Sequence, residues 1–299
     1  MKITKTSELT GHKNSLYALS PALDAHKFYA AGADGNVVEW DLDAPDTAQL
    51  LVQVNQPVYA LRLDAAKKML FIAQKAGGLH IVDLDKKQEV KLLNLHQKEV
   101  FDVSIVNNRI ICASADGKIS VVNNENYTFE KYLTDLQCSV RCITNSVKHN
   151  IFAVGSSDGC IRIYESNTHQ LKKILQKHTN SVFTLAFSLC NNYLVSGSRD
   201  AHLIVWDINN DYEVMKQIPA HYFTINSLCF SPCAQYLATA SRDKNIRIWN
   251  ARTFELLKVI DAVRNGAHKA SVNKLWWSSY KNQLVSCSDD KKIMTWLID

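Results

Sequence analysis

The sequence predicts an all-β fold made of seven copies of one four-stranded unit. Two observations carry this prediction. A tight-turn motif followed by an apolar strand recurs along all 299 residues, and nearly every recurrence is followed by one more strand-like segment. A period of about 40 residues is the signature of a repeat architecture, so the repeat decides the fold class before any single segment is assigned.

The third strand of each unit is its most regular element. Six segments align without gaps, QKAGGLHIVDL fits as a degenerate seventh copy, and one aromatic or apolar position recurs at intervals of 40 to 47 residues. The residue three places earlier is apolar in every copy, as a strand position that faces a core requires. The recurring positions are Trp40, Val82, Val122, Tyr164, Trp206, Trp249 and Trp296.

A hairpin precedes this strand in each unit. The residue six places before the aromatic position is Asp in six copies and Ala76 in the second, and Gly follows it in the first four. Asp-Gly between two apolar runs favours a tight hairpin, so each unit is a β-meander. A histidine stands 20 to 22 residues before the Asp in five copies, as His12, His96, His178, His221 and His268.

These phased markers resemble the WD-repeat family over the full length of the chain. Gly11-His12 opens the first unit, and Trp40-Asp41 and Trp206-Asp207 match the dipeptide that names the family. The resemblance implies a seven-bladed β-propeller of four-stranded antiparallel blades around a channel. The chain is particularly similar to stand-alone bacterial WD-repeat proteins, and we expect one domain over residues 1–299.

The seventh unit lacks an outer strand of its own. Six units show a fourth, outer strand, but only three residues follow Trp296. Residues 2–9 have the pattern of an unassigned strand ahead of the first unit. We therefore predict that this N-terminal strand completes blade seven, which leaves no blade with an unpaired edge.

The recurring polar residues could be mistaken for a hydrolase triad. An enzyme needs a catalytic set only once, whereas this set recurs in three blades, so we interpret its role as structural. The resemblance identifies it as the family's structural tetrad, a buried hydrogen-bonded chain. The sets are His178, Ser196, Asp200 and Trp206; His221, Thr239, Asp243 and Trp249; and His268, Ser286, Asp290 and Trp296.

The other blades keep less of this set. Blade one has Ala30 at the hydroxyl position, where Cys112 and Val154 stand in blades three and four. We expect blades two to four to depend more on apolar packing.

Catalytic and cofactor signatures are missing from the sequence. It has no phosphate-binding loop, no zinc-protease motif, no nucleophile elbow and no dinucleotide-binding motif. We predict that the protein is not an enzyme and takes no cofactor or metal. Without a secretion signal or a membrane segment it is expected in the cytoplasm, or in the nucleus of a eukaryote, with its eight cysteines reduced.

Two columns of the repeat are candidates for partner binding. The first lies five residues after the histidine position, at the start of the innermost strand, and comprises Tyr17, Tyr59, Phe101, Arg141, Phe183, Asn226 and Asn273. The second precedes the turn Asp and comprises Ala33, Lys75, Ala115, Ser157, Arg199, Arg242 and Asp289. In the family, the face with the connections between blades often receives partners around the channel mouth.

These columns predict a basic sector on blades four to six and an aromatic sector on blades one to three. An insertion before His268 adds Arg264, which we expect to protrude on the same face. Tyr, Phe and Arg are favoured as interface anchors, so we predict a peptide partner with an acidic group and a hydrophobic anchor. The alternative is that the aromatics only fill the mouth and the arginines are solvated.

The leading functional hypothesis is a non-catalytic scaffold or adaptor, a monomeric propeller that works within a complex with one or more proteins. The net charge of +5 and the arginines beside aromatics keep a second hypothesis open, nucleic-acid or ribonucleoprotein association. A third is an enzyme with an unrecognised channel site.

Overall fold

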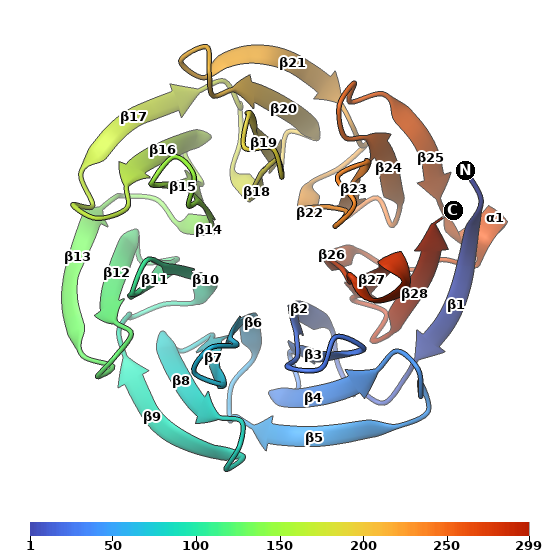
Figure 1. The fold of residues 1–299 in the computed structure, drawn as a ribbon, viewed down its shortest axis with the longest axis horizontal. Coiled ribbons are helices and arrows are strands. Elements are labelled where there is room, and N and C mark those ends of the chain that lie inside the picture. The colour runs from blue at the N-terminus through green and yellow to red at the C-terminus, as the bar shows by residue number, and fades with distance from the viewer. Residues whose placement is uncertain (299) are drawn as a thin grey trace.

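Seven four-stranded antiparallel sheets stand in a ring in the computed structural model (Figure 1). The structure describes residues 1–298, apart from the side chains of residues 134 and 135, so residue 299 of the predicted domain lies outside the described residues. In blades one to six the strands pair in chain order from the innermost to the outermost. The predicted seven-bladed propeller is confirmed.

The strands match the repeat units of the sequence. Blades one to three contain β2 (Leu16–Pro21), β3 (Lys27–Gly32), β4 (Asn36–Asp41) and β5 (Ala48–Gln53); β6 (Val58–Asp64), β7 (Met69–Gln74), β8 (Gly78–Asp83) and β9 (Gln88–Asn94); and β10 (Val100–Val106), β11 (Arg109–Ser114), β12 (Lys118–Asn123) and β13 (Phe129–Asp135). Blades four to six contain β14 (Val140–Ser146), β15 (Ile151–Ser156), β16 (Cys160–Glu165) and β17 (Leu171–Gln176); β18 (Val182–Phe187), β19 (Tyr193–Ser198), β20 (His202–Asp207) and β21 (Glu213–Pro219); and β22 (Ile225–Phe230), β23 (Tyr236–Ser241), β24 (Ile246–Asn250) and β25 (Leu256–Ile260).

Blade seven joins the two ends of the chain. It contains β26 (Val272–Trp277), β27 (Gln283–Ser288) and β28 (Ile293–Ile298), and its outer strand is β1 (Ile3–Leu9). The β1 strand pairs antiparallel with β28, from Ile3 opposite Ile298 to Leu9 opposite Ile293. Figure 1 shows the two termini side by side at this blade. The predicted closure by the N-terminal strand is therefore confirmed.

The hydrophobic core consists of seven layers, each between two neighbouring blades. The layer that closes the ring packs Leu9 and Trp40 against Val285 and Ile293. The second strand of each blade buries side chains on both of its faces, because every blade has a neighbour on each side. The ring therefore has no central apolar core, and its middle is free for a channel.

The innermost strand of every blade carries a β-bulge at the same place. Register shifts fall between Leu16 and Ala18 in blade one and between Val272 and Lys274 in blade seven, and the other five blades shift at the equivalent position. The bulged residue is therefore a member of the first predicted column in all seven blades. A bulge leaves its extra residue outside the ladder and re-aims its side chain, here to the channel mouth.

The helices are short. The four residues of α1 (Ala262–Asn265) fill the insertion before blade seven, and η1 (Tyr280–Asn282) joins β26 to β27. Within residues 1–298, no helix has the length and apolar character that crossing a membrane requires. All eight cysteines are free thiols.

Candidate functional site

The polar set of blade six forms a continuous hydrogen-bonded chain. His221 Nδ1 lies 2.9 Å from Asp243 Oδ2, and His221 Nε2 lies 2.8 Å from Thr239 Oγ1. Trp249 Nε1 donates to the same Thr239 oxygen at 2.9 Å. The chain joins the connection between blades to the hairpin and then to two strands of one sheet.

The protonation states of this chain follow from its contacts. Burial opposes ionisation of Asp243, but hydrogen bonds from His221 and from two backbone N–H groups outweigh it and lower the pKa of Asp243. Burial lowers the pKa of His221 against the pull of Asp243. The imidazole is therefore neutral, its Nδ1–H donates to the carboxylate, and the Thr239 hydroxyl donates to Nε2. With every group satisfied, the chain has a structural role.

Blades five and seven repeat this geometry with Ser196 and Ser286 as the hydroxyls. The histidine-to-hydroxyl distances are 2.8 Å and 2.9 Å, and Trp206 and Trp296 donate at 2.9 Å and 3.0 Å. Blade one has only the first link. Among the described residues, the buried His12 Nε2 and Trp40 Nε1 have no hydrogen-bond partner, because Ala30 lacks the hydroxyl that would join them.

Blade three keeps more of the chain than we expected from Cys112. His96 Nε2 lies 2.9 Å from the hydroxyl of Ser120, which stands directly opposite Cys112 on the next strand. Blade three therefore keeps a link from histidine to hydroxyl, although Val122 at the tryptophan position leaves it without the last donor of a full tetrad. Blade four has no histidine at this position, and Asp158 instead accepts from Arg162 Nη2 at 2.6 Å and from Ser156 Oγ at 2.7 Å.

The first predicted column comes together at the channel mouth. A pocket of about 190 Å³ is lined by all seven of its residues, with Asp102 and Lys274 beside them. Tyr17 stacks on Tyr59 at 5.3 Å between ring centroids, and Tyr59 meets Phe101 edge to face at 5.5 Å. The aromatic sector is therefore a packed arc over blades one to three.

Arg141 extends this arc. Its guanidinium lies 4.5 Å from the Phe101 ring centroid and 4.7 Å from that of Phe183, and its Nε donates to Ser157 Oγ at 3.0 Å. Burial lowers the pKa of Arg141, and the nearby charge of Arg199 lowers it further. The guanidinium lies against both rings, so Arg141 is part of the wall of the mouth.

The two asparagines of the column connect neighbouring blades. Asn226 Nδ2 donates to Val272 O at 2.9 Å, and Asn273 Nδ2 donates to Leu16 O at 2.9 Å and to Asp289 Oδ1 at 2.8 Å. They link blade six to blade seven and blade seven to blade one. Their amides are therefore occupied within the protein.

The second column lies beside the first in every blade. Each of its backbone N–H groups donates to the carbonyl two residues before a mouth residue; Arg199 N, for example, donates to Ser181 O at 2.9 Å, ahead of Phe183. Arg242 N donates to Thr224 O at 3.0 Å. Both columns therefore share the face that carries the connections between blades and the Asp hairpins, here called the top face.

Arg199 and Arg242 are exposed on this face, and neither has an ion pair among residues 1–298. Beside them stand two aromatics that the sequence analysis missed, Tyr222 with 80% and Phe223 with 59% of its surface exposed. They directly follow the tetrad residue His221. Only their position in a connection signalled exposure, because the repeat alignment marks no column there.

Arg264 lies apart from the other candidates. It lies on α1, which Figure 1 places at the outer rim beside β1. With Met1, Lys2 and Lys258 it lines a separate rim pocket, and it lies 3.6 Å from Asp261. The structure therefore does not bring it to the channel mouth.

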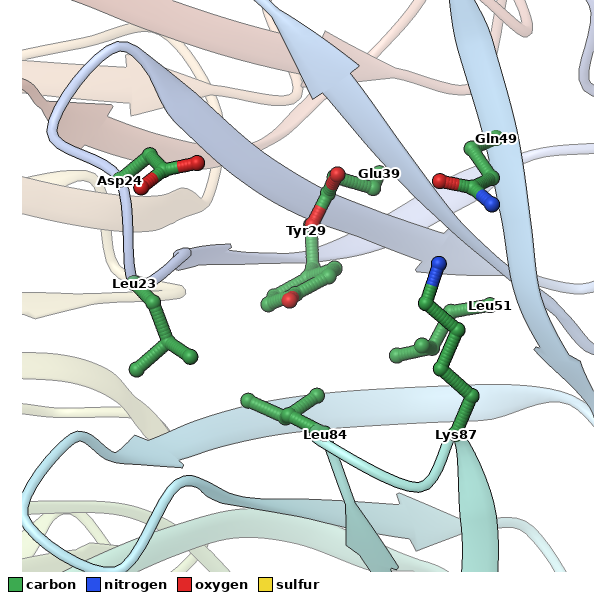
Figure 2. Close-up of a pocket in the computed structure, with 8 residues that line it drawn as sticks. All are labelled: Leu23, Asp24, Tyr29, Glu39, Gln49, Leu51, Leu84 and Lys87. Carbon is green, nitrogen blue, oxygen red and sulfur yellow. The ribbon is translucent and has the colours of Figure 1, made fainter.

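A further cleft lies between blades one and two (Figure 2). Its volume is about 150 Å³, and Tyr29, Leu51 and Leu84 form its apolar part. Its acidic groups are paired, because Lys27 lies 3.5 Å from Asp24 and 3.3 Å from Glu39. Burial raises the pKa of Tyr29 and keeps its phenol neutral. None of the predicted site residues lies here.

Comparisons with known proteins agree with this architecture. The model of the WD domain, G-beta repeat, matches residues 3–41, 128–165, 169–207, 212–250 and 260–296. The chain is similar to the WD40 β-propeller domain of Doa1, with a TM-score of 0.87 and 19% identity, over 100% of this chain and 98% of that one. No curated protein sequence matches the chain. In the part of the chain that the structure describes, no group of His, Cys, Asp or Glu has a metal-binding arrangement.

Proposed function

This chain belongs to the WD40 repeat family, and from that premise we propose that it is a non-catalytic interaction platform whose top face binds an acidic peptide or loop of a partner protein. The fold is typical of protein-interaction scaffolds. The observation that carries the proposal is the pair of unpaired arginines, Arg199 and Arg242, beside the exposed Tyr222 and Phe223.

These four side chains have complementary uses in an interface. Exposed aromatic rings bury a large area when a partner covers them, and arginine forms bidentate bonds with carboxylates. Tyr222 N donates to Asp243 Oδ2 at 3.1 Å, so the tetrad holds the connection that presents both aromatics. A partner would therefore meet a preorganised surface, which lowers the entropy cost of binding.

A displayed library of random peptides tests this proposal. We expect selection on the full chain to enrich peptides with Asp or Glu next to an aromatic or large aliphatic residue. The Arg199→Glu/Arg242→Glu double variant should then bind an enriched peptide at least tenfold more weakly. The matched control is Lys172→Glu/Lys258→Glu, an equal charge change on the exposed outer strands β17 and β25, which should leave affinity unchanged. Enrichment without acidic residues, or unchanged affinity of the arginine variant, contradicts the proposal.

Single-stranded RNA is the second candidate, favoured by the same aromatic and arginine neighbours, since bases stack on exposed rings. Binding to a homopolymer RNA would decrease steeply between about 50 and 200 mM salt, because released counterions drive it. Fluorescence anisotropy with a labelled oligonucleotide at these salt concentrations separates the two candidates.

A further inference from the structure

The channel beneath the mouth contains charges that the top-face surface does not use. A cavity of about 470 Å³ is lined by the innermost strands of all seven blades. Its charged lining residues are Arg62, Asp102 and Lys274, and the other lining residues are apolar or carry hydroxyl or thiol groups. These charges stand on blades two, three and seven.

Neither cation has a protein partner. Within residues 1–298, the side chains of Arg62 and Lys274 form no ion pair and donate no hydrogen bond. The Arg62 side chain is open to the channel but surrounded by the inner strands, and this burial lowers its pKa although Asp102 and Asp64 oppose the change. A cation in such a confined place gains more from an anion than a cation in bulk water does.

Asp102 does not neutralise this pair. Its Oδ1 accepts from Val103 N at 2.9 Å, and its Oδ2 accepts from Ile143 N at 2.8 Å in the next blade. The carboxylate thus helps to connect blades three and four. Two cations against one carboxylate leave the channel with a net positive charge.

Two hydroxyl groups add donors at the level of Lys274. Thr184 Oγ1 accepts from Leu228 N and Ser227 Oγ accepts from Leu275 N, both at 3.1 Å. Neither hydroxyl donates to a protein acceptor in the described chain, so both protons are free to donate into the cavity. Thr184, Ser227 and Lys274 each follow the bulged mouth residue, so three consecutive blades present donors in one layer.

We propose that the channel binds a small anion, a phosphate or carboxylate group, between Lys274 and the hydroxyls of Thr184 and Ser227. Arg62 follows its own mouth residue, Tyr59, by three places, about 7 Å deeper along the channel than the Lys274 layer at about 3.3 Å per residue. A ligand with two anionic groups can therefore reach both cations. This site needs no partner protein and is independent of the top-face proposal.

Calorimetric titration of the full chain with orthophosphate and, separately, with succinate tests the site at low ionic strength. We expect saturable binding with one site per chain. Lys274→Met should weaken the binding of both probes at least tenfold, and Arg62→Met should do so for succinate, whose second carboxylate can reach Arg62. Lys274→Arg, which keeps the charge, should stay within threefold of the wild type. The control Lys172→Met removes an exposed cation from β17 and should change nothing.

The two probes also identify the chemical source of the anion. Tighter binding of orthophosphate indicates a phosphate ligand, and tighter binding of succinate indicates a carboxylate. Non-saturable heats with both probes, or equal affinity of the wild type and Lys274→Met, overturn the proposal. Thermal melts check the fold of each variant, and if Lys274→Met unfolds, Arg62→Met and Lys274→Arg decide the outcome.

Discussion

Blades six and two form the same four-stranded sheet but differ in the side chains buried within it. Blade six holds the hydrogen-bonded chain from Asp243 to Trp249, whereas blade two has Ala76 at the Asp position and Val82 at the Trp position. Both have four strands in the same order and the same bulge in the innermost strand. The tetrad is therefore not needed to make a blade.

What the tetrad adds is a fixed top face. In blade six, His221 precedes the exposed Tyr222 and Phe223, and Asp243 directly follows Arg242. The chain thus connects a loop and a hairpin that both carry candidate docking residues. Blade two has no such chain, and its mouth residue Tyr59 is instead held by packing against Tyr17 and Phe101.

Deleting residues 1–9 should have the largest effect on stability. It tests whether a blade with a complete tetrad remains folded without its outer strand. The deletion removes the ladder to β28 and the buried Leu9, and it exposes a strand edge. We expect a loss of cooperative unfolding or a Tm decrease of more than about 10 °C, since one kcal/mol shifts Tm by a few degrees in a chain of this size. Circular dichroism melts measure this.

The control for this deletion removes only Met1 and Lys2, which precede β1, and should leave Tm unchanged. An unchanged Tm after the full deletion would show that the polar chain and the other three strands suffice.

Acid should destabilise the tetrad blades next most strongly. The folded-state pKa of Asp243 is below its ordinary 3.8, so its contribution is complete above that pH and is lost as the pH falls further. The folded-state pKa of His221 is below its ordinary 6.5, so the unfolded chain takes up protons first and stability begins to decrease below about pH 6.5. Urea unfolding between pH 7 and pH 3 should show both phases.

Two variants assign these phases. His221→Gln should reduce the phase near pH 6.5. Asp158→Asn in blade four, whose Asp pairs with Arg162 and not with a histidine, should reduce only the phase below pH 4. A single phase in the wild type, or an unchanged upper phase in His221→Gln, would argue against this assignment.

The sequence predicted the ring, the closing strand and the members of three tetrads because these features repeat at fixed intervals. Ser120 escaped prediction because it replaces Cys112 from the neighbouring strand, and only the register of β11 against β12 places the two opposite each other. A repeat alignment compares equivalent positions, so it cannot detect a group that substitutes from another position.

Contacts within the candidate site were harder to predict than its membership. The mouth column was found by spacing, but spacing cannot show that Arg141 lies between Phe101 and Phe183. Nor can it show that Asn273 bonds across the ring closure to Leu16. These contacts join different blades, and their geometry depends on how tightly the ring closes.

Exchanging valine and threonine at the hydroxyl position compares a blade that has the polar chain with one that lacks it. Thr239→Val in blade six leaves His221 Nε2 and Trp249 Nε1 buried without a partner, and we expect a loss of about 2–4 kcal/mol. The reverse change, Val154→Thr in blade four, places a hydroxyl where neither a histidine nor a tryptophan can bond to it. It should lower the free energy of unfolding by about 1–3 kcal/mol. Urea denaturation measures both, and a neutral Thr239→Val would show that the chain contributes nothing to stability.

Restoring the missing hydroxyl of blade one should have the smallest effect, and a favourable one. In Ala30→Ser the new hydroxyl can donate to His12 Nε2 and accept from Trp40 Nε1, both of which lack partners among the described residues. Satisfying two buried groups should raise the free energy of unfolding by about 1–2 kcal/mol, as measured by urea denaturation. Ala31→Ser is the matched control, because Ala31 is equally buried but packs in the layer toward blade two, away from this pair, and should destabilise the protein. If Ala30→Ser also destabilises the protein, the interior of blade one is packed too tightly around Ala30 to accept a hydroxyl group between His12 and Trp40.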